Sequence, residues 1–253
     1  MRCAPPVISS ISAVALVATV LALGCDRTRE ANAQPAPQPP GEASRPGEPT
    51  AVDVAGDKPV LVVPGNPSVR RPIVHLHGMC APPRKSLDAW GRVAKDQGTI
   101  VTLVGDIPCP DEPGQTKWSD DATKIDARIS AAITAVNVAR GTNLDTKEIL
   151  VIGESMGAAR AESLAKANPE RYSRLVLVGS PQVVSPSNVR GVRSIANLAG
   201  EREPQQMAKA ATLSLTRAGL DSQFFELSGA AHSEYGPNGE RTMRDAIAFV
   251  TRR

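Results

Sequence analysis

Short runs of β-branched and apolar residues alternate with amphipathic stretches over most of this chain of 253 residues. Several of the runs are almost continuously apolar, as strands buried on both faces of a parallel sheet must be. The alternation predicts a doubly wound α/β fold, with a mostly parallel twisted sheet of about 7–8 strands and helices on both faces. The predicted strands are 59–63, 72–78, 99–106, 148–155, 174–180, 192–200 and 222–229. The predicted helices are 86–98, 122–141, 155–170, 203–220 and 239–253.

The spacing of the predicted elements and the composition of the chain restrict the predicted fold and function further. Only about a dozen residues separate the strands at 174–180 and 192–200, so we expect no large cap domain there. Hydrophobic residues make up 41% of the chain and charged residues 22%, which is ordinary for a folded soluble domain. A net charge of +3, scattered along the chain, and 3% aromatic residues argue against a nucleic-acid partner.

The N-terminus has the features of an export signal. Arg2 precedes an apolar run from Val7 to Leu23, and the run ends in Leu21-Ala22-Leu23-Gly24-Cys25. This ending resembles the lipobox of bacterial lipoproteins, which implies a signal peptide over 1–25 and a lipid on Cys25. An uncleaved anchor helix and a plain signal peptide are the alternatives. Each of these readings places the rest of the chain outside the cytoplasm, and a lipid would anchor it to the periplasmic face or outer surface of a bacterial membrane.

A change of composition separates this signal from the folded part. The stretch 26–50 is rich in proline and poor in apolar residues, so it cannot bury enough surface to fold. We interpret 26–50 as a disordered tether and 51–253 as one folded domain, which we expect to be a monomer.

One strand runs directly into a helix through Gly153-Glu154-Ser155-Met156-Gly157. A GxSxG sequence in this context is typical of a nucleophile elbow, whose tight turn needs glycine where a β-carbon would collide. The turn would expose the Ser155 hydroxyl at the carboxyl end of the sheet. Ser155 is therefore the candidate nucleophile, with Gly153 and Gly157 shaping the elbow.

A serine nucleophile needs a base and an acid that orients it. His232 is the one histidine after Ser155 and follows the last predicted strand, whereas His75 lies within a strand and should be buried. Glu203 follows the preceding strand and is the candidate acid, with Glu201 as its competitor. Asp221 precedes its strand and Glu226 lies within it, so both are weaker candidates.

The negative oxygen of a tetrahedral intermediate needs two amide donors. The backbone N–H of Met156, directly after the nucleophile, is one candidate. The Met79 N–H, in the turn His77-Gly78-Met79 that follows a predicted strand, is the other.

These four motifs, GESMG, HGM, GERE and GAAHS, resemble in their order the α/β-hydrolase fold in its serine-hydrolase form. The resemblance covers roughly residues 55–253, and it departs from the family pattern in having Glu rather than the commoner Asp as acid. The strands before Cys80 and Cys109 are neighbours in that family, which implies a disulfide between these two cysteines. Neither metal-ligand spacing nor a phosphate-binding glycine loop is present, so we expect no metal and no cofactor.

The resemblance implies a serine hydrolase that cleaves carboxylic esters through a Ser155-His232-Glu203 triad and an acyl-enzyme. A small-molecule ester or the ester end of a polymer would be its substrate. The same groups could serve a thioesterase or an acyltransferase. A non-catalytic envelope lipoprotein that uses the hydrolase scaffold for binding is the rival from another class.

Overall fold

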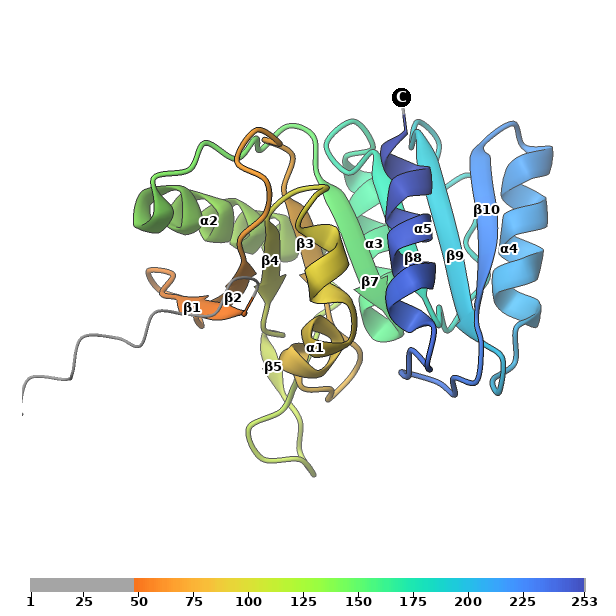
Figure 1. Ribbon diagram of the computed structural model, residues 1–253, viewed down its shortest axis with the longest axis horizontal. Helices are drawn as coiled ribbons and strands as arrows, with labels where there is room; N and C mark the ends of the chain where they lie inside the picture. Colours follow the sequence, from red (N-terminus) through yellow and green to blue (C-terminus); the bar gives the residue numbers. More distant parts are fainter. Residues whose placement is uncertain (1–47, 253) are drawn as a thin grey trace, which may run out of the picture. The chain divides into compact units, whose positions relative to one another are not determined.

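A computed structural model describes residues 48–252, and these contain every strand and helix predicted above (Figure 1). The strands are β1 (Thr50–Val52), β2 (Val60–Val63), β3 (Ile73–Leu76), β4 (Ile100–Leu103), β5 (Ile107–Pro108), β6 (Thr116–Lys117), β7 (Leu150–Glu154), β8 (Arg174–Val178), β9 (Ser194–Gly200) and β10 (Asp221–Leu227). The helices are α1 (Pro83–Ala94), α2 (Ala122–Arg140), α3 (Met156–Ala167), α4 (Gln206–Arg217) and α5 (Gly239–Thr251). The predicted signal peptide, Cys25 and nearly all of the predicted tether lie outside the described residues.

Eight strands form one sheet in the order β1-β2-β4-β3-β7-β8-β9-β10. The pairs β1–β2 and β2–β4 are antiparallel, and all the other pairs in this sheet are parallel. The predicted mostly parallel α/β sheet is thus confirmed. The sequence reading missed β1, which begins at Thr50 inside the predicted tether, and the small β5–β6 hairpin. Both are too short to give a periodic signal.

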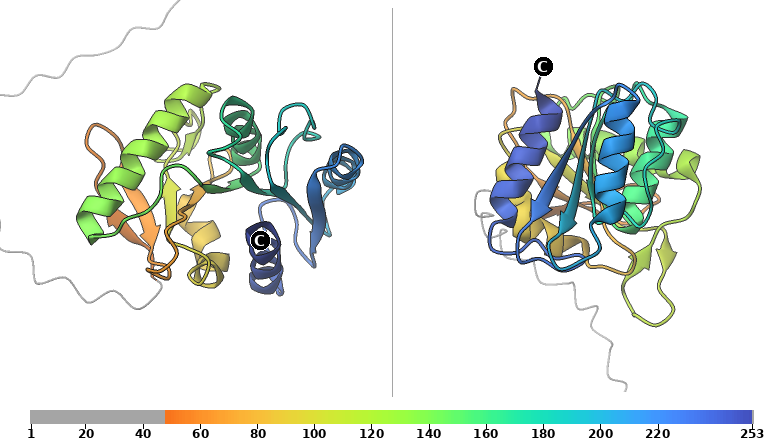
Figure 2. Two further views of the ribbon diagram at one scale, coloured as in Figure 1. Left: turned by 90° about the horizontal axis from the view of Figure 1, so that it is seen from above. Right: turned by 90° about the vertical axis from the view of Figure 1, so that its right-hand side faces the viewer.

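Helices cover both faces of the sheet (Figure 2). Apolar side chains of α2, α3 and α4 pack on one face, including Ile129, Ala161 and Leu215. Helices α1 and α5 pack on the other face, through side chains such as Trp90 and Ile247. The strands between these layers are buried on both sides, which explains their continuous apolar runs.

The segment between β8 and β9 contains neither helix nor strand, so no large cap interrupts the fold there. Glu162, a buried residue of α3, accepts hydrogen bonds from the Ser185 N–H and from the side-chain amides of Gln182 and Asn188. These contacts fasten the segment to α3. Beside it, the loops that follow β3, β7, β9 and β10 all leave the same carboxyl edge of the sheet, which brings the candidate residues together.

Candidate active site

Ser155 lies between β7 and α3 in a conformation that side-chain-bearing residues rarely adopt, with φ 51° and ψ −115°. The two flanking glycines make this turn possible. A β-carbon on Gly153 would lie 2.4 Å from the Gly157 carbonyl oxygen, and one on Gly157 would lie 2.0 Å from that of Leu76. The Ser155 N–H donates to the Val178 carbonyl at 2.8 Å, which ties the turn to β8. The sequence therefore folds here into the strained strand-to-helix elbow that the motif predicted.

His232 lies between Ser155 and Glu203. Its Nε2 is 3.0 Å from the Ser155 Oγ, and its Nδ1 is 2.5 Å from the Glu203 Oε2. The second Glu203 oxygen accepts the Gly200 N–H at 2.6 Å, which fixes the carboxylate. Since a carboxylate only accepts hydrogen bonds, His232 donates its Nδ1–H to Glu203 and keeps Nε2 free to accept the serine proton.

The other candidate acids have different partners. Glu201 accepts the Gly229 N–H at 2.7 Å, and Glu226 accepts from the Gln205 side chain at 2.9 Å. Asp221 pairs with Arg252 at the opposite edge of the sheet. Of the four carboxylates considered from the sequence, Glu203 alone contacts the His232 ring.

The loop after β3 brings a backbone amide next to the nucleophile. A β-carbon on Gly78 would lie 3.5 Å from the Ser155 Cβ, so this loop passes directly beside the serine. Among residues 48–252, the N–H groups of Met79 and Met156 donate to no protein acceptor. The two amides predicted as oxyanion donors are thus near Ser155 and free to bind a ligand oxygen.

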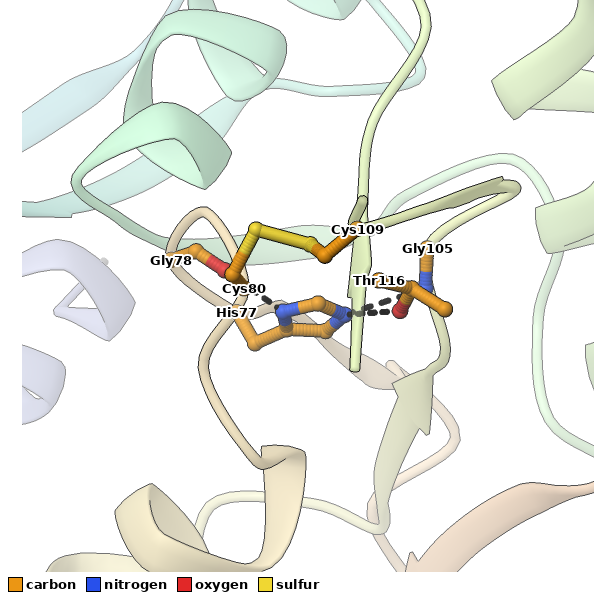
Figure 3. Close-up of a disulfide and its surroundings, with 6 residues drawn as sticks. All are labelled: His77, Gly78, Cys80, Gly105, Cys109 and Thr116. Atoms are coloured by element: carbon orange, nitrogen blue, oxygen red, sulfur yellow. Dashed lines mark hydrogen bonds between the residues drawn. A yellow bond between two sulfur atoms is a disulfide. The ribbon is translucent and has the colours of Figure 1, made fainter. Parts of the chain in front are cut away.

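The buried side chain of His77 fixes this loop (Figure 3). The sequence identified His77 only as part of the turn. Its Nδ1–H donates to the Gly78 carbonyl at 2.7 Å, and its Nε2 accepts the Gly105 N–H at 3.0 Å. Because the C=O and N–H of a trans peptide point in opposite directions, fixing the Gly78 carbonyl also fixes the Met79 N–H. Complete burial lowers the pKa of His77 to about 4, so its ring is neutral at neutral pH.

The predicted disulfide is present in the structure: Cys80 and Cys109 are bonded, with their Cα atoms 5.9 Å apart. Figure 3 shows this bond directly above the His77 ring. The Cys80 N–H also donates to the Thr116 carbonyl of β6 at 2.9 Å. The residue after Met79 is therefore joined to the β5–β6 hairpin by both a covalent bond and a hydrogen bond.

A buried polar group beneath the elbow was not predicted. Glu154, next to Ser155, accepts hydrogen bonds from the Ser86 hydroxyl of α1 and the Tyr235 hydroxyl, at 2.5 and 3.2 Å. Burial, and then the neighbouring Glu154 carboxylate, raise the pKa of Tyr235 well above its usual value. The loop that carries His232 is thereby anchored to the elbow and to α1. No sequence motif marks such a contact, because its three members come from distant segments.

Comparisons with known proteins identify the architecture. No protein-family model matches the chain, and no curated protein matches it either. Among solved structures, a predicted CIB-like hydrolase from Thermoplasma acidophilum superposes with a TM-score of 0.59 at 16% identity, covering 80% of this chain and 96% of that one. A fluorophosphonate-binding serine hydrolase from Staphylococcus aureus gives a TM-score of 0.59 at 10% identity, covering 83% and 100%. A thermostable carboxyl esterase from Bacillus coagulans gives 0.56 at 12% identity, covering 79% and 94%.

The chain has the α/β-hydrolase fold. At these identities the likeness establishes the fold alone. In this α/β-hydrolase sheet, Ser155, Glu203, His232 and Met79 all follow the carboxyl ends of strands. Within residues 48–252, no three His, Cys, Asp or Glu side chains are arranged to hold a metal ion. None of the helices described is long and apolar enough to cross a membrane.

Proposed function

We propose that the protein is a serine hydrolase that cleaves carboxylic esters through an acyl-enzyme. The observation that carries this proposal is the continuous hydrogen-bonded chain from the Ser155 Oγ through the His232 ring to Glu203. A hydroxyl, an imidazole and a carboxylate in this order form the arrangement that activates a serine for attack on a carbonyl carbon.

In the acylation step, His232 Nε2 takes the proton of Ser155 as its Oγ attacks the ester carbonyl. The carbonyl oxygen becomes negative and accepts hydrogen bonds from the Met79 and Met156 N–H groups. Glu203 stabilises the resulting imidazolium through the Nδ1–H. The tetrahedral intermediate then collapses, its bond to the alkoxide oxygen breaks, and His232 returns its proton to the leaving alcohol.

Deacylation repeats these steps with water. His232 takes a proton from a water molecule that attacks the acyl carbon, and the second tetrahedral oxyanion binds to the same two amides. Its collapse releases the carboxylic acid and returns the proton to Ser155. His232 is half exposed, with 51% of its side chain accessible, so solvent water can approach the site.

The open carboxyl edge favours short acyl esters or the exposed ester end of a larger substrate. The segment between β8 and β9, where a cap would lie, is short and fastened to α3 by Glu162. Nothing in that segment would enclose a long acyl chain.

We also propose that the enzyme is exported and held at the cell envelope by a lipid on Cys25, as a monomer that reaches its substrate on the tether 26–50. The lipobox-like sequence supports the lipid, and the Cys80–Cys109 bond fits an oxidising compartment.

The test is hydrolysis of p-nitrophenyl esters, from acetate to dodecanoate, by the full-length chain and by Ser155→Ala. We expect Ser155→Ala to lower kcat by about 10⁴-fold or more and to lose labelling by a fluorophosphonate probe. Ser228→Ala, which removes an exposed serine from the loop that carries His232, is the matched control and should behave as wild type.

The outcomes separate the alternatives. Labelling at Ser155 without hydrolysis would redirect the search to thioesters or to acyl transfer, which product analysis with sugar or peptide acceptors would detect. Folded wild-type protein that neither hydrolyses nor labels would refute the enzyme and favour a binding lipoprotein.

A further inference from the structure

A charged cavity of about 410 Å³ lies at the amino edge of the sheet, opposite Ser155. It is lined by Arg174, Arg193, Ser194, Asp221 and Arg252. Arg174, Ser194 and Asp221 are the first residues of β8, β9 and β10 and stand in register. Residues in register on neighbouring strands project from the same face of a sheet. The three side chains therefore share the face that α5 covers.

Among residues 48–252, positive charge exceeds negative charge around this cavity. The Oε1 atom of Glu148 lies within 3.2 Å of Arg174 and of Arg193, and 3.9 Å from Arg71. Arg252 pairs with Asp221 at 2.6 Å. Four guanidinium groups thus share two carboxylates. Burial and the nearby Arg174 lower the pKa of Arg71, as expected where like charges are held together.

Two of the lining groups, Arg174 and Ser194, are buried. The Arg174 side chain is 9% exposed and donates to the Val250 carbonyl near the end of α5. Ser194 is 3% exposed, and among the described residues its Oγ has no hydrogen-bond partner. A buried hydroxyl without a partner is unfavourable unless a ligand binds it. Arg193, 63% exposed, extends from this buried floor toward solvent.

We propose that this cavity is a binding site for a phosphate group, carried either by a soluble compound or by a lipid headgroup. The exposed Arg193 guanidinium and the Nη2 of Arg174, whose Nε and Nη1 already donate to Glu148 and Val250, would donate to the phosphate oxygens, and the Ser194 hydroxyl would donate from below. The local excess of positive charge matches an anion, and the volume leaves space for the organic group that bears the phosphate. This site is independent of the proposed hydrolysis.

The first test is calorimetric titration of the full-length chain in a neutral detergent with inorganic phosphate and with glycerol phosphate at constant ionic strength. We expect saturable binding, and a Kd about tenfold weaker in Arg193→Gln, since one charge-assisted contact is lost. Ser194→Ala should also weaken binding. Arg244→Gln, which removes an exposed arginine of α5 outside the cavity, is the matched control and should bind as wild type. Absence of saturable binding, or equal Kd values for Arg193→Gln and wild type, would overturn the proposal.

The second test separates the two sources of phosphate. The full-length chain is kept in a phosphate-free neutral detergent or reconstituted in vesicles of phosphatidylglycerol, and modification of Arg193 by phenylglyoxal is followed by mass spectrometry. Protection by the anionic vesicles indicates a lipid headgroup, whereas protection only when glycerol phosphate is added indicates a soluble ligand. Equal modification under all these conditions would refute the site.

Discussion

Two loops at the carboxyl edge of the sheet contribute residues to the proposed active site, and they are anchored by different contacts. The oxyanion loop, residues 77–81 after β3, depends on the buried His77 ring and on the Cys80–Cys109 disulfide. The histidine loop, residues 228–238 after β10, carries a half-exposed His232 and is anchored through Tyr235 to the buried Glu154. One loop fixes a backbone amide, and the other presents a side chain to solvent.

The difference follows from what each group has to do. An amide that stabilises a transient oxyanion contributes most when it is already aimed, because no reorganisation is then needed during the reaction. A general base has to exchange protons with serine, alcohol and water in turn, which requires that each of them can reach the ring. Changes to the histidine loop should therefore act mainly on activity, and changes to the oxyanion loop on both stability and activity.

The largest effect should come from the acid that orients His232. We expect Glu203→Gln to lower kcat for p-nitrophenyl acetate by about 10⁴-fold, because a neutral amide neither fixes the Nδ1–H tautomer nor stabilises the imidazolium. Glu201→Gln is the matched control, since the Glu201 carboxylate accepts the Gly229 N–H rather than a proton of the His232 ring, and should retain most activity. Equal losses in the two variants would contradict the assignment of Glu203.

The residues of the proposed triad could be predicted from the sequence because they follow strand ends in a recognisable order. Ser155 ends one predicted strand, Glu203 and His232 each come three residues after another, and a parallel sheet gathers such residues at one edge. The structure brings these three into one hydrogen-bonded chain and places the Met79 amide beside them. The roles of His77 and Glu154 could not be predicted from the sequence. Their hydrogen-bond partners, Gly105, Ser86 and Tyr235, lie in segments that come together only in the folded structure.

The disulfide should have the next largest effect. We expect Cys80→Ser/Cys109→Ser to lower the free energy of unfolding by about 3–4 kcal/mol, from the entropy of the opened loop. It should also lower kcat about tenfold, because the Met79 amide loses the covalent one of the three contacts that fix its loop, the others being the His77 and Cys80 N–H hydrogen bonds. Urea denaturation and ester hydrolysis measure the two effects, and a reducing agent should change wild type but not the double variant. An unchanged kcat would indicate that the His77 and Cys80 N–H hydrogen bonds are sufficient to orient the Met79 amide.

The buried histidines should make stability depend on pH. The pKa of His77 is lowered to about 4 and that of His75 to about 3, in both cases mainly by burial. The unfolded chain therefore binds protons first as the pH falls below about 6.5, so stability is complete above that pH and is lost below it. We expect a loss of about 2 kcal/mol for each histidine between pH 7 and pH 5, measured by urea denaturation. His75→Leu should show about half the wild-type slope, and a flat wild-type profile would contradict the neutral, buried state of His77.

The smallest effect tests the packing of the histidine loop. Gly179, directly after β8, has φ 56°, and a β-carbon there would lie 3.0 Å from the His232 Cε1. We expect Gly179→Ala to cost about 1–2 kcal/mol of stability from the left-handed backbone. It should also lower kcat about tenfold, because a ring displaced by a fraction of an ångström no longer aligns with Ser155.

Gly219→Ala is the matched control for this backbone cost. Gly219 also has a positive φ, of 80°, but no atom lies within 4 Å of its added β-carbon. Both variants should lose similar stability, and only Gly179→Ala should lose activity. If Gly219→Ala lost as much activity, the effect would come from general destabilisation. If neither variant lost activity, the His232 ring would tolerate displacement, and the histidine loop would be able to readjust its position around the added methyl group. Comparing the losses of kcat and of unfolding free energy in these two variants thus measures how precisely the His232 ring must be positioned. This is a direct test of the histidine loop, which leaves the ring half exposed to water.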